Sequence, residues 1–246
     1  MIMVISVMLR ILYIEHLEAL RRMFFKIFAV FAVFCIPGWI FSGKMVDALL
    51  RYAAPEGFKL HYFSLMEPFF VRLEVTILAA AVVAFPFTVM FIWEFIRPAL
   101  HNDEAGKLAV PVFFIIVLAF AGGAAALFGM VPAVMEFSIS LAGDEFTPVI
   151  GIGNFVSLVL GLVIAGMLVF QFPLVVYALL VLKVVTLAAL RRFRRWVIVV
   201  ILIVAGIFTP PDVASQVLMA LPCYLLFEAA LWIYSIRHKE DAGETV

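Results

Sequence analysis

Long apolar segments separated by short polar ones run through almost the whole chain of 246 residues. About 20 helical residues are needed to cross the roughly 30 Å hydrocarbon core of a bilayer, so apolar segments of this length predict transmembrane helices. We place six spans, near residues 24–43, 69–93, 108–135, 155–182, 196–209 and 214–235. The pattern therefore predicts an all-α integral membrane protein with six transmembrane helices.

The last two segments are expected to be unusually short. Trp196 to Thr209 comprises 14 residues, which as a helix is about 21 Å long. The following segment is interrupted by Asp212 at its start and by Glu228 near its end. Because neither segment crosses an ordinary bilayer comfortably, we expect either a short hairpin that dips into the membrane or a local thinning of the membrane.

The first 23 residues have a helical pattern of their own. Apolar residues recur on one stripe of a helix and charged residues lie away from it; the apolar set is Ile5, Leu9, Leu12, Leu17, Leu20 and Phe24, and the charged set is Arg10, Glu15, Glu18, Arg21 and Arg22. The segment lacks the basic leader and small-residue cleavage site of a secretory signal peptide. We expect residues 1–23 to form a helix in the cytoplasmic membrane interface that leads into the first span.

The basic residues predict the orientation of the spans. Six spans place both termini on one side of the membrane, and that side holds 13 of the 17 lysine and arginine residues. Loops rich in lysine and arginine normally stay in the cytoplasm. Both termini are therefore predicted to be cytoplasmic, with residues 236–246 as a tail, and the whole chain, residues 1–246, is expected to form one membrane domain.

Composition supports this class and argues against others. Hydrophobic residues make up 67% of the chain and charged residues 14%, with a mean hydropathy of +1.21, whereas soluble domains are near half apolar. The 17 basic residues balance 17 acidic ones, so there is no basic excess to bind nucleic acid. Cys35 and Cys223 lie in apolar segments without a second cysteine or a histidine at metal-ligand spacing.

Polar side chains inside apolar segments are costly, which makes them functional candidates. Gln171 either hydrogen-bonds to a neighbouring helix or belongs to a polar patch that receives a docking helix. Glu228 either reaches water near the inner end of the sixth span or contacts a partner. Asp212 and Gln216, four residues apart, lie on one helical face; Asp212 either caps the helix after Pro210–Pro211 or contacts a neighbouring subunit.

Five motifs occur in a characteristic order along the chain. They are EHLEALRR at 15–22, SLMEPFF at 64–70, WEFIRPALHNDE at 93–104, VFQFPLVVY at 169–177 and TPPDVASQVLMALPCYLLFE at 209–228. Together they resemble the signature segments of the TatC family, the multi-spanning core of the twin-arginine protein translocase. The resemblance covers nearly everything from His16 to Glu228.

This resemblance implies both an architecture and a function. Members of the family form a concave six-helix bundle that binds twin-arginine signal peptides at its cytoplasmic face. With TatA-like and TatB-like single-span partners, and several TatC copies in one complex, they carry folded proteins across the inner membrane using the proton-motive force. No bond is made or broken, so the resemblance implies no enzyme activity and no cofactor; the partners are signal peptides, other subunits and membrane lipid.

The same resemblance points to particular residues. Carboxylates match guanidinium groups best, because they accept paired hydrogen bonds. Glu104 occupies the position of the family's loop glutamate, although it could also be a solvated acid offset by Lys107. The other residues expected to bind signal peptides are Glu18, Glu15, Leu20, Arg21, Phe95 and Pro98. Glu67, in the second motif, joins Gln171, Asp212, Gln216 and Glu228 as a polar residue in the membrane or at a partner.

The chain also departs from the family pattern. Ala19 stands where the family has its second glutamate, so we expect Glu18 or Glu15 to substitute, unless Glu18 is paired with Arg22 at i+4. Glu74 replaces a lysine, Met90-Phe91 replaces a Tyr-Gln pair, and Glu94 and Arg97 resemble an exchanged ion pair.

Two other classes of protein are compatible with six spans. A small-solute secondary transporter should show two related halves and polar groups that converge at the bilayer midplane, and residues 1–123 and 124–246 show no convincing repeat. A structural membrane scaffold does not explain the acids of the cytoplasmic loop.

Overall fold

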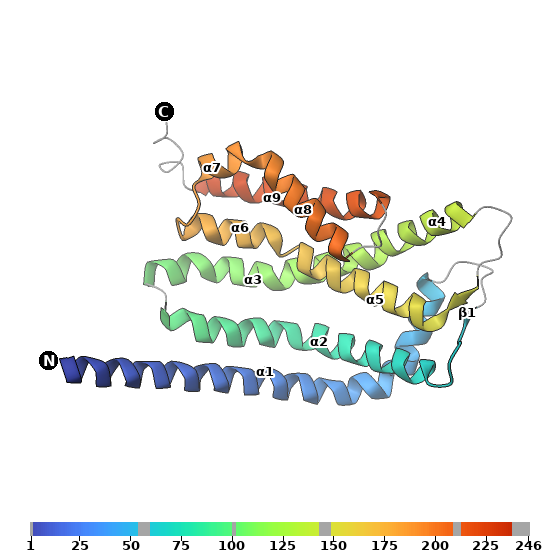
Figure 1. Ribbon diagram of the computed structural model, residues 1–246, viewed down its shortest axis with the longest axis horizontal. Helices are drawn as coiled ribbons and strands as arrows, with labels where there is room; N and C mark the ends of the chain where they lie inside the picture. Colours follow the sequence, from blue (N-terminus) through green and yellow to red (C-terminus); the bar gives the residue numbers. More distant parts are fainter. Residues whose placement is uncertain (1, 54–59, 100–101, 143–148, 209–212, 238–246) are drawn as a thin grey trace.

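The computed structural model describes residues 2–53, 60–99, 102–142, 149–208 and 213–237 (Figure 1). Its helices are α1 (Ile2–Ala53), α2 (Glu67–Ile96), α3 (Asn102–Ala125), α4 (Val131–Ala142), α5 (Ile152–Val169), α6 (Phe172–Val181), α7 (Leu187–Arg192), α8 (Arg194–Phe208) and α9 (Val213–Arg237). Helices are expected of so apolar a chain, because lipid offers the backbone no hydrogen-bond partners and a helix supplies its own.

Short elements join these helices. A 3-10 turn, Arg97–Ala99, follows α2, and a π-helical turn, Ala126–Met130, connects α3 to α4. Strands β1 (Leu60–His61) and β2 (Ile150–Gly151) pair in parallel and hold the start of α2 beside the start of α5.

The centre of the bundle is built around α5, which contacts α2, α3 and α8. Its inward positions are fully buried and include Phe155, Val159, Leu162 and Val169. Helix α1 lies at one edge beside α2 (Figure 1), and the most apolar window of its span has no buried residue. An apolar face left open in this way suits contact with lipid rather than with water.

Five segments among the described residues are long and apolar enough to cross a membrane: Leu17–Ala53, Glu67–Ile96, Val112–Ser138, Ile152–Val181 and Gln216–Ile236. They coincide with five of the six predicted spans and confirm a multi-spanning helical membrane protein. The remaining predicted span, 196–209, falls on α8, whose 15 residues reach only about 22 Å. As predicted, this helix is short.

The prediction of a short sixth helix is wrong. Helix α9 runs unbroken for 25 residues, about 37 Å, through both Pro222 and Glu228. The helix continues through Glu228 because Arg194 and Tyr224 pair its carboxylate. The charge is therefore compensated without the helix having to end in water.

The predicted boundary after residue 23 is also absent. Helix α1 continues without interruption through 52 residues, so the amino-terminal segment and the first span are one helix. Because the side chains of residues 2–16 lie outside the described part, an interfacial position for this segment stays a prediction.

Candidate functional site

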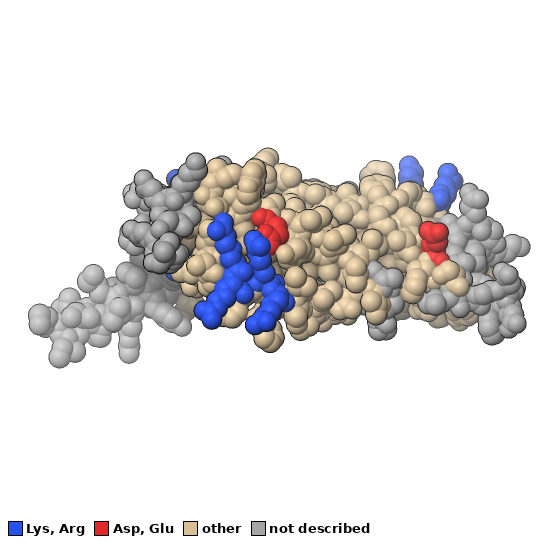
Figure 2. All heavy atoms as spheres, turned by 90° about the horizontal axis from the view of Figure 1, so that it is seen from above, with Lys and Arg blue, Asp and Glu red and all other residues tan. Residues whose placement is uncertain are grey.

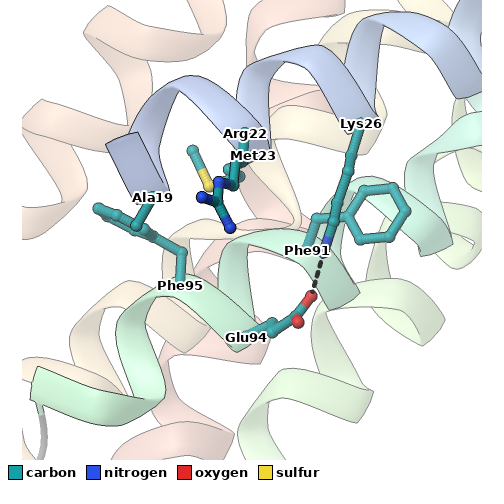
Figure 3. A pocket seen from close by; sticks show the side chains of 7 residues that line it. All are labelled: Ala19, Arg22, Met23, Lys26, Phe91, Glu94 and Phe95. Atoms are coloured by element: carbon teal, nitrogen blue, oxygen red, sulfur yellow. Dashed lines mark hydrogen bonds and ion pairs between the residues drawn. The ribbon is translucent and has the colours of Figure 1, made fainter. Parts of the chain in front are cut away.

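A cavity of about 230 Å³ opens between α1 and α2, near the end of the bundle where α2 finishes (Figures 1 and 3). Helix α1 contributes Ala19, Arg22, Met23 and Lys26 to its lining, and α2 contributes Phe91, Glu94 and Phe95. On each helix these positions are one, three or four residues apart, which places them on one face. The cavity thus forms where polar residues in the amino-terminal half of α1 face the carboxyl-terminal end of α2.

One ion pair bridges this cavity. Lys26 Nζ lies 3.0 Å from Glu94 Oε2, and the ammonium group also lies 5.5 Å from the centre of the Phe91 ring (Figure 3). Both charged side chains are substantially exposed, at 49% for Lys26 and 67% for Glu94. Glu94 is the sole carboxylate among the described residues that line the cavity.

Of the residues predicted to bind signal peptides, Phe95 lines this cavity. Leu20 and Arg21 lie between the lining residues Ala19 and Arg22 in sequence; Leu20 is half-buried and Arg21 is exposed. Pro98 lies exposed in the turn that follows α2. Glu18 forms an ion pair of 3.6 Å with Arg22. This is the alternative to its direct role in binding that the i+4 spacing had left open.

The side chains of Glu15 and Glu104 lie outside the described part of the chain, although their backbones belong to α1 and α3. Their predicted role in binding stays a prediction.

Sequence reasoning missed Lys26 and assigned Glu94 to the wrong partner. Glu94 was expected to pair with Arg97, three residues later, but its ion pair is with Lys26 of another helix. The signal for Lys26 was available, because it follows Ala19 by seven residues and therefore lies on the same face of α1.

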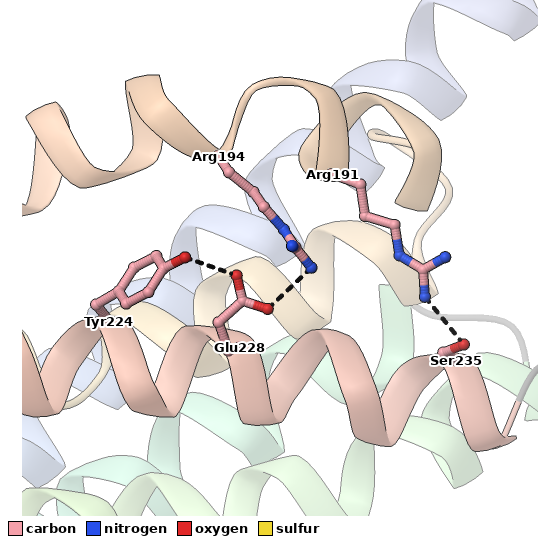
Figure 4. Close-up of polar contacts among 5 residues, drawn as sticks. All are labelled: Arg191, Arg194, Tyr224, Glu228 and Ser235. Atoms are coloured by element: carbon pink, nitrogen blue, oxygen red, sulfur yellow. Dashed lines mark hydrogen bonds and ion pairs between the residues drawn. The ribbon is translucent and has the colours of Figure 1, made fainter.

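Glu228 belongs to a polar network that joins α7 and α8 to α9 (Figure 4). Tyr224 Oη donates a hydrogen bond of 2.9 Å to Glu228 Oε1, and Arg194 Nη2 donates one of 3.0 Å to Oε2. Arg191 Nη2 donates to Ser235 Oγ at 3.2 Å. Figure 2 shows basic side chains gathered on this part of the surface, separated by a long uncharged stretch from a smaller charged group at the other end.

Gln171 lies in the turn between α5 and α6. Its side-chain Nε2 donates to the carbonyl oxygens of Ile115 (3.1 Å) and Met167 (3.2 Å), as expected of an interhelical hydrogen bond. Its Oε1 is buried with no hydrogen-bond partner among the described residues. The amide therefore ties α3 to the α5–α6 turn.

Gln216 and Glu67 likewise connect helices. Gln216 Nε2 donates to the carbonyl oxygen of Leu202 at 2.7 Å, which joins α9 to α8. Glu67 accepts from the backbone N–H groups of Phe63 (2.6 Å) and Gly153 (2.7 Å), so one carboxylate joins the start of α2 to the start of α5. Asp212 lies outside the described residues.

The arrangement suits recognition more than chemistry. The cavity between α1 and α2 offers an accessible carboxylate, aromatic rings and an exposed cation at one end of a lipid-facing bundle. Carboxylates and aromatic faces are the groups that bind guanidinium ions best. A multi-pass helical membrane protein with a charged cavity near the end of its bundle is therefore the class that fold and site define.

The chain belongs to the TatC family. The family model described as "Sec-independent protein translocase protein (TatC)" matches residues 15–222.

Similar proteins agree with this assignment. The TatC protein of Halothiobacillus neapolitanus is 37% identical over 198 residues, which cover 79% of this chain and 53% of that protein, so the chain spans about half the length of this relative. The TatC protein of Carboxydothermus hydrogenoformans is 33% identical over 201 residues, covering 81% of this chain and 83% of the relative. A crystal structure of the "Twin Arginine Translocase Receptor- TatC in DDM" matches with a TM-score of 0.77 at 28% identity, covering 89% of this chain and 98% of that one.

Proposed function

We propose that this chain is the receptor subunit of a twin-arginine translocase, which binds twin-arginine signal peptides and helps to move folded proteins across the membrane. The observation that carries the proposal is that one cavity is lined by residues of two motifs far apart in sequence, with Ala19 from 15–22 and Phe95 from 93–104. Family membership and the printed description of the similar crystal structure as a receptor support the same conclusion.

The site lies on the cytoplasmic side in this proposal. Both termini, Glu15, Glu18 and Glu104 then face the cytoplasm, where signal peptides of folded proteins arrive. The excess of lysine and arginine at this end of the chain supports the orientation. The whole chain acts as one domain of the inner membrane.

The partners are TatA-like and TatB-like single-span proteins, and several copies of the chain share one complex driven by the proton-motive force. The short α8 and the adjoining start of α9 are where a partner helix docks, beside Gln216 and Asp212. Large apolar side chains exposed along α8, among them Val199, Ile203 and Ile207, support this location. Gln171, Glu67 and Glu228 act by holding the helices that form these surfaces.

The test is binding of a fluorescent twin-arginine signal peptide to the chain in lipid nanodiscs, compared with the same peptide carrying twin lysines. We expect the twin-arginine peptide to bind at least about tenfold more tightly, because guanidinium groups form paired hydrogen bonds with carboxylates. We also expect charge reversal at Glu104 together with Glu15 and Glu18 to remove this preference. Equal binding of the two peptides overturns the proposal and favours the transporter or scaffold.

A further inference from the structure

The carboxylate of Glu94 occupies the wall of the cavity opposite α1, where Ala19 contributes only a methyl group. Figure 3 shows Ala19 on one helix, and Glu94 and Phe95 on the other, around the same opening. We propose that Glu94 is the carboxylate that binds a signal-peptide arginine in this cavity, and that Lys26 occupies it until the arginine arrives. This inference rests on the proposed function and adds to it a residue and an exchange mechanism.

The charges around the cavity require an exchange. Arg22 is matched by Glu18 and Lys26 by Glu94, so these four residues carry no net charge. An added guanidinium would find no unpaired acid among them and must displace a cation. Of these two acids Glu94 is the one that lines the cavity, so a guanidinium that enters the cavity takes Glu94 from Lys26.

The geometry keeps the free-energy cost of breaking the Lys26–Glu94 ion pair small. Both members of the ion pair are exposed to about half or more, and ion pairs in such positions contribute little to stability. Lys26 approaches one carboxylate oxygen, Oε2, whereas a guanidinium can bind both oxygens at once. The displaced ammonium keeps a second favourable contact, the face of the Phe91 ring.

Aromatic side chains complete the site for a guanidinium. Phe91 and Phe95 flank Glu94 on the same face of α2; the Phe91 ring keeps its contact with Lys26, and Phe95 is the ring that lies beside an arriving arginine. Arginine stacks on aromatic faces better than lysine does, because its charged group is planar and weakly hydrated. The cavity therefore discriminates twin arginines from twin lysines by shape as well as by hydrogen bonding.

The experiment measures affinity for the twin-arginine peptide in nanodiscs with variants of opposite expected sign. Glu94→Gln keeps the shape of the side chain and removes its charge, and should weaken binding by about tenfold or more. Lys26→Gln removes the competitor and should tighten binding by roughly two- to fivefold. A merely structural ion pair predicts equal effects for the two variants, so weaker binding in both overturns the proposal.

A further variant separates binding from folding. Ala19→Glu should restore at least part of the binding lost in Glu94→Gln, because it returns a carboxylate to the same cavity. No rescue by Ala19→Glu contradicts the proposal.

A matched control is Glu74→Gln. Glu74 is an exposed carboxylate on the same helix whose hydrogen bond to Ser157 lies far from the cavity, so this change should leave affinity unaltered. The failure of this inference is distinguishable from failure of the proposed function. If the native chain prefers twin arginines but Glu94→Gln binds with unchanged affinity, only the proposed role of Glu94 is wrong. If the native chain shows no preference for twin arginines, the proposed receptor function is wrong.

Discussion

Gly122 and Gly166 determine how closely α3 and α5 approach each other. A Cβ atom on either glycine would collide with the carbonyl oxygen of the other, so the two helix backbones are in direct contact here. Membrane helices associate by such close packing of small residues, because lipid supplies no hydrophobic force between them.

Gly122→Ala should therefore destabilise the protein by about 1–3 kcal/mol, since backbone rather than a flexible side chain must move. The measurement is the loss of folded protein on heating in detergent, followed by size-exclusion chromatography. Gly129→Ala is the matched control, because a Cβ at Gly129 meets nothing within 4 Å. Equal losses in the two variants would show that the contact does not determine the effect, because the higher helix propensity of alanine should by itself stabilise both variants.

At this same scale, sequence pattern predicted the candidate site only in part. Phe95 was predicted from its motif and Ala19 was noted as the position that lacks the family's second glutamate; the cavity brings the two together. Glu94 was noticed but paired with Arg97, because spacing along one helix says nothing about a residue on another. The position of Lys26 opposite Glu94 depends on how α1 and α2 pack, which a local pattern does not contain.

At the scale of elements, apolar length predicted the helices well and their ends poorly. Helix α9 is longer than predicted, at 25 residues. In the sequence Glu228 looks like an uncompensated charge that should interrupt the helix, but in the folded chain Tyr224 and Arg194 pair its carboxylate. The continuity of α1 was missed for a related reason. The pattern of α1 changes from amphipathic to uniformly apolar after residue 23. Such a change indicates a different surrounding for the two parts of the helix, but it does not require a break between them.

The junction between α5 and α6 shows how a helix break is compensated. Pro173 has no N–H group, so it cannot donate the helical hydrogen bond to the carbonyl oxygen of Val169, four residues earlier. Cys223 of α9 supplies one instead, with its Sγ 3.6 Å from that oxygen. A residue that reads as a small apolar side chain thus connects two helices.

This contact predicts a specific coupling in stability. Cys223→Ala should cost more in the native background than in a Pro173→Ala background, where residue 173 can itself donate to Val169. The difference should be about 0.5–1 kcal/mol, the contribution of a weak hydrogen bond. A double-mutant cycle of thermal or denaturant unfolding measures it, because the cavity left by Cys223→Ala is common to both backgrounds and cancels. Additive effects would show that the sulfur merely fills space.

At the scale of the whole molecule, the bundle has a charge difference between its two ends. Arg191 and Arg192 end α7 and Arg194 and Arg195 begin α8, and the predicted topology places Lys26 and Arg97 at the same end of the bundle. The opposite end holds β1, β2 and the start of α2 (Figure 1). Since lysine and arginine resist transfer across the inner membrane, this difference predicts which end stays inside.

Labelling with a membrane-impermeant maleimide in intact cells tests this orientation and whether the short helix α8 crosses the membrane. Cysteines introduced at Tyr62 and Val213 should react from outside, whereas one at Arg192 should react only after the membrane is opened. All three native side chains are exposed. The native Cys223 is buried and Cys35 is half-buried in an apolar span, so both should stay unlabelled.

Val213 is the decisive position, because it lies at the far end of α8 from Arg192. Its reaction from outside requires the 15 residues of α8 to cross the whole membrane. A helix of this length spans about 22 Å, which is shorter than the roughly 30 Å of an ordinary hydrocarbon core. The bilayer must then thin beside α8, and longer-chain lipids in nanodiscs should reduce labelling at this position while leaving Tyr62 unaffected. If Val213 reacts only from inside, α8 and the start of α9 form a hairpin that enters the membrane without crossing it, and the chain has fewer than six spans.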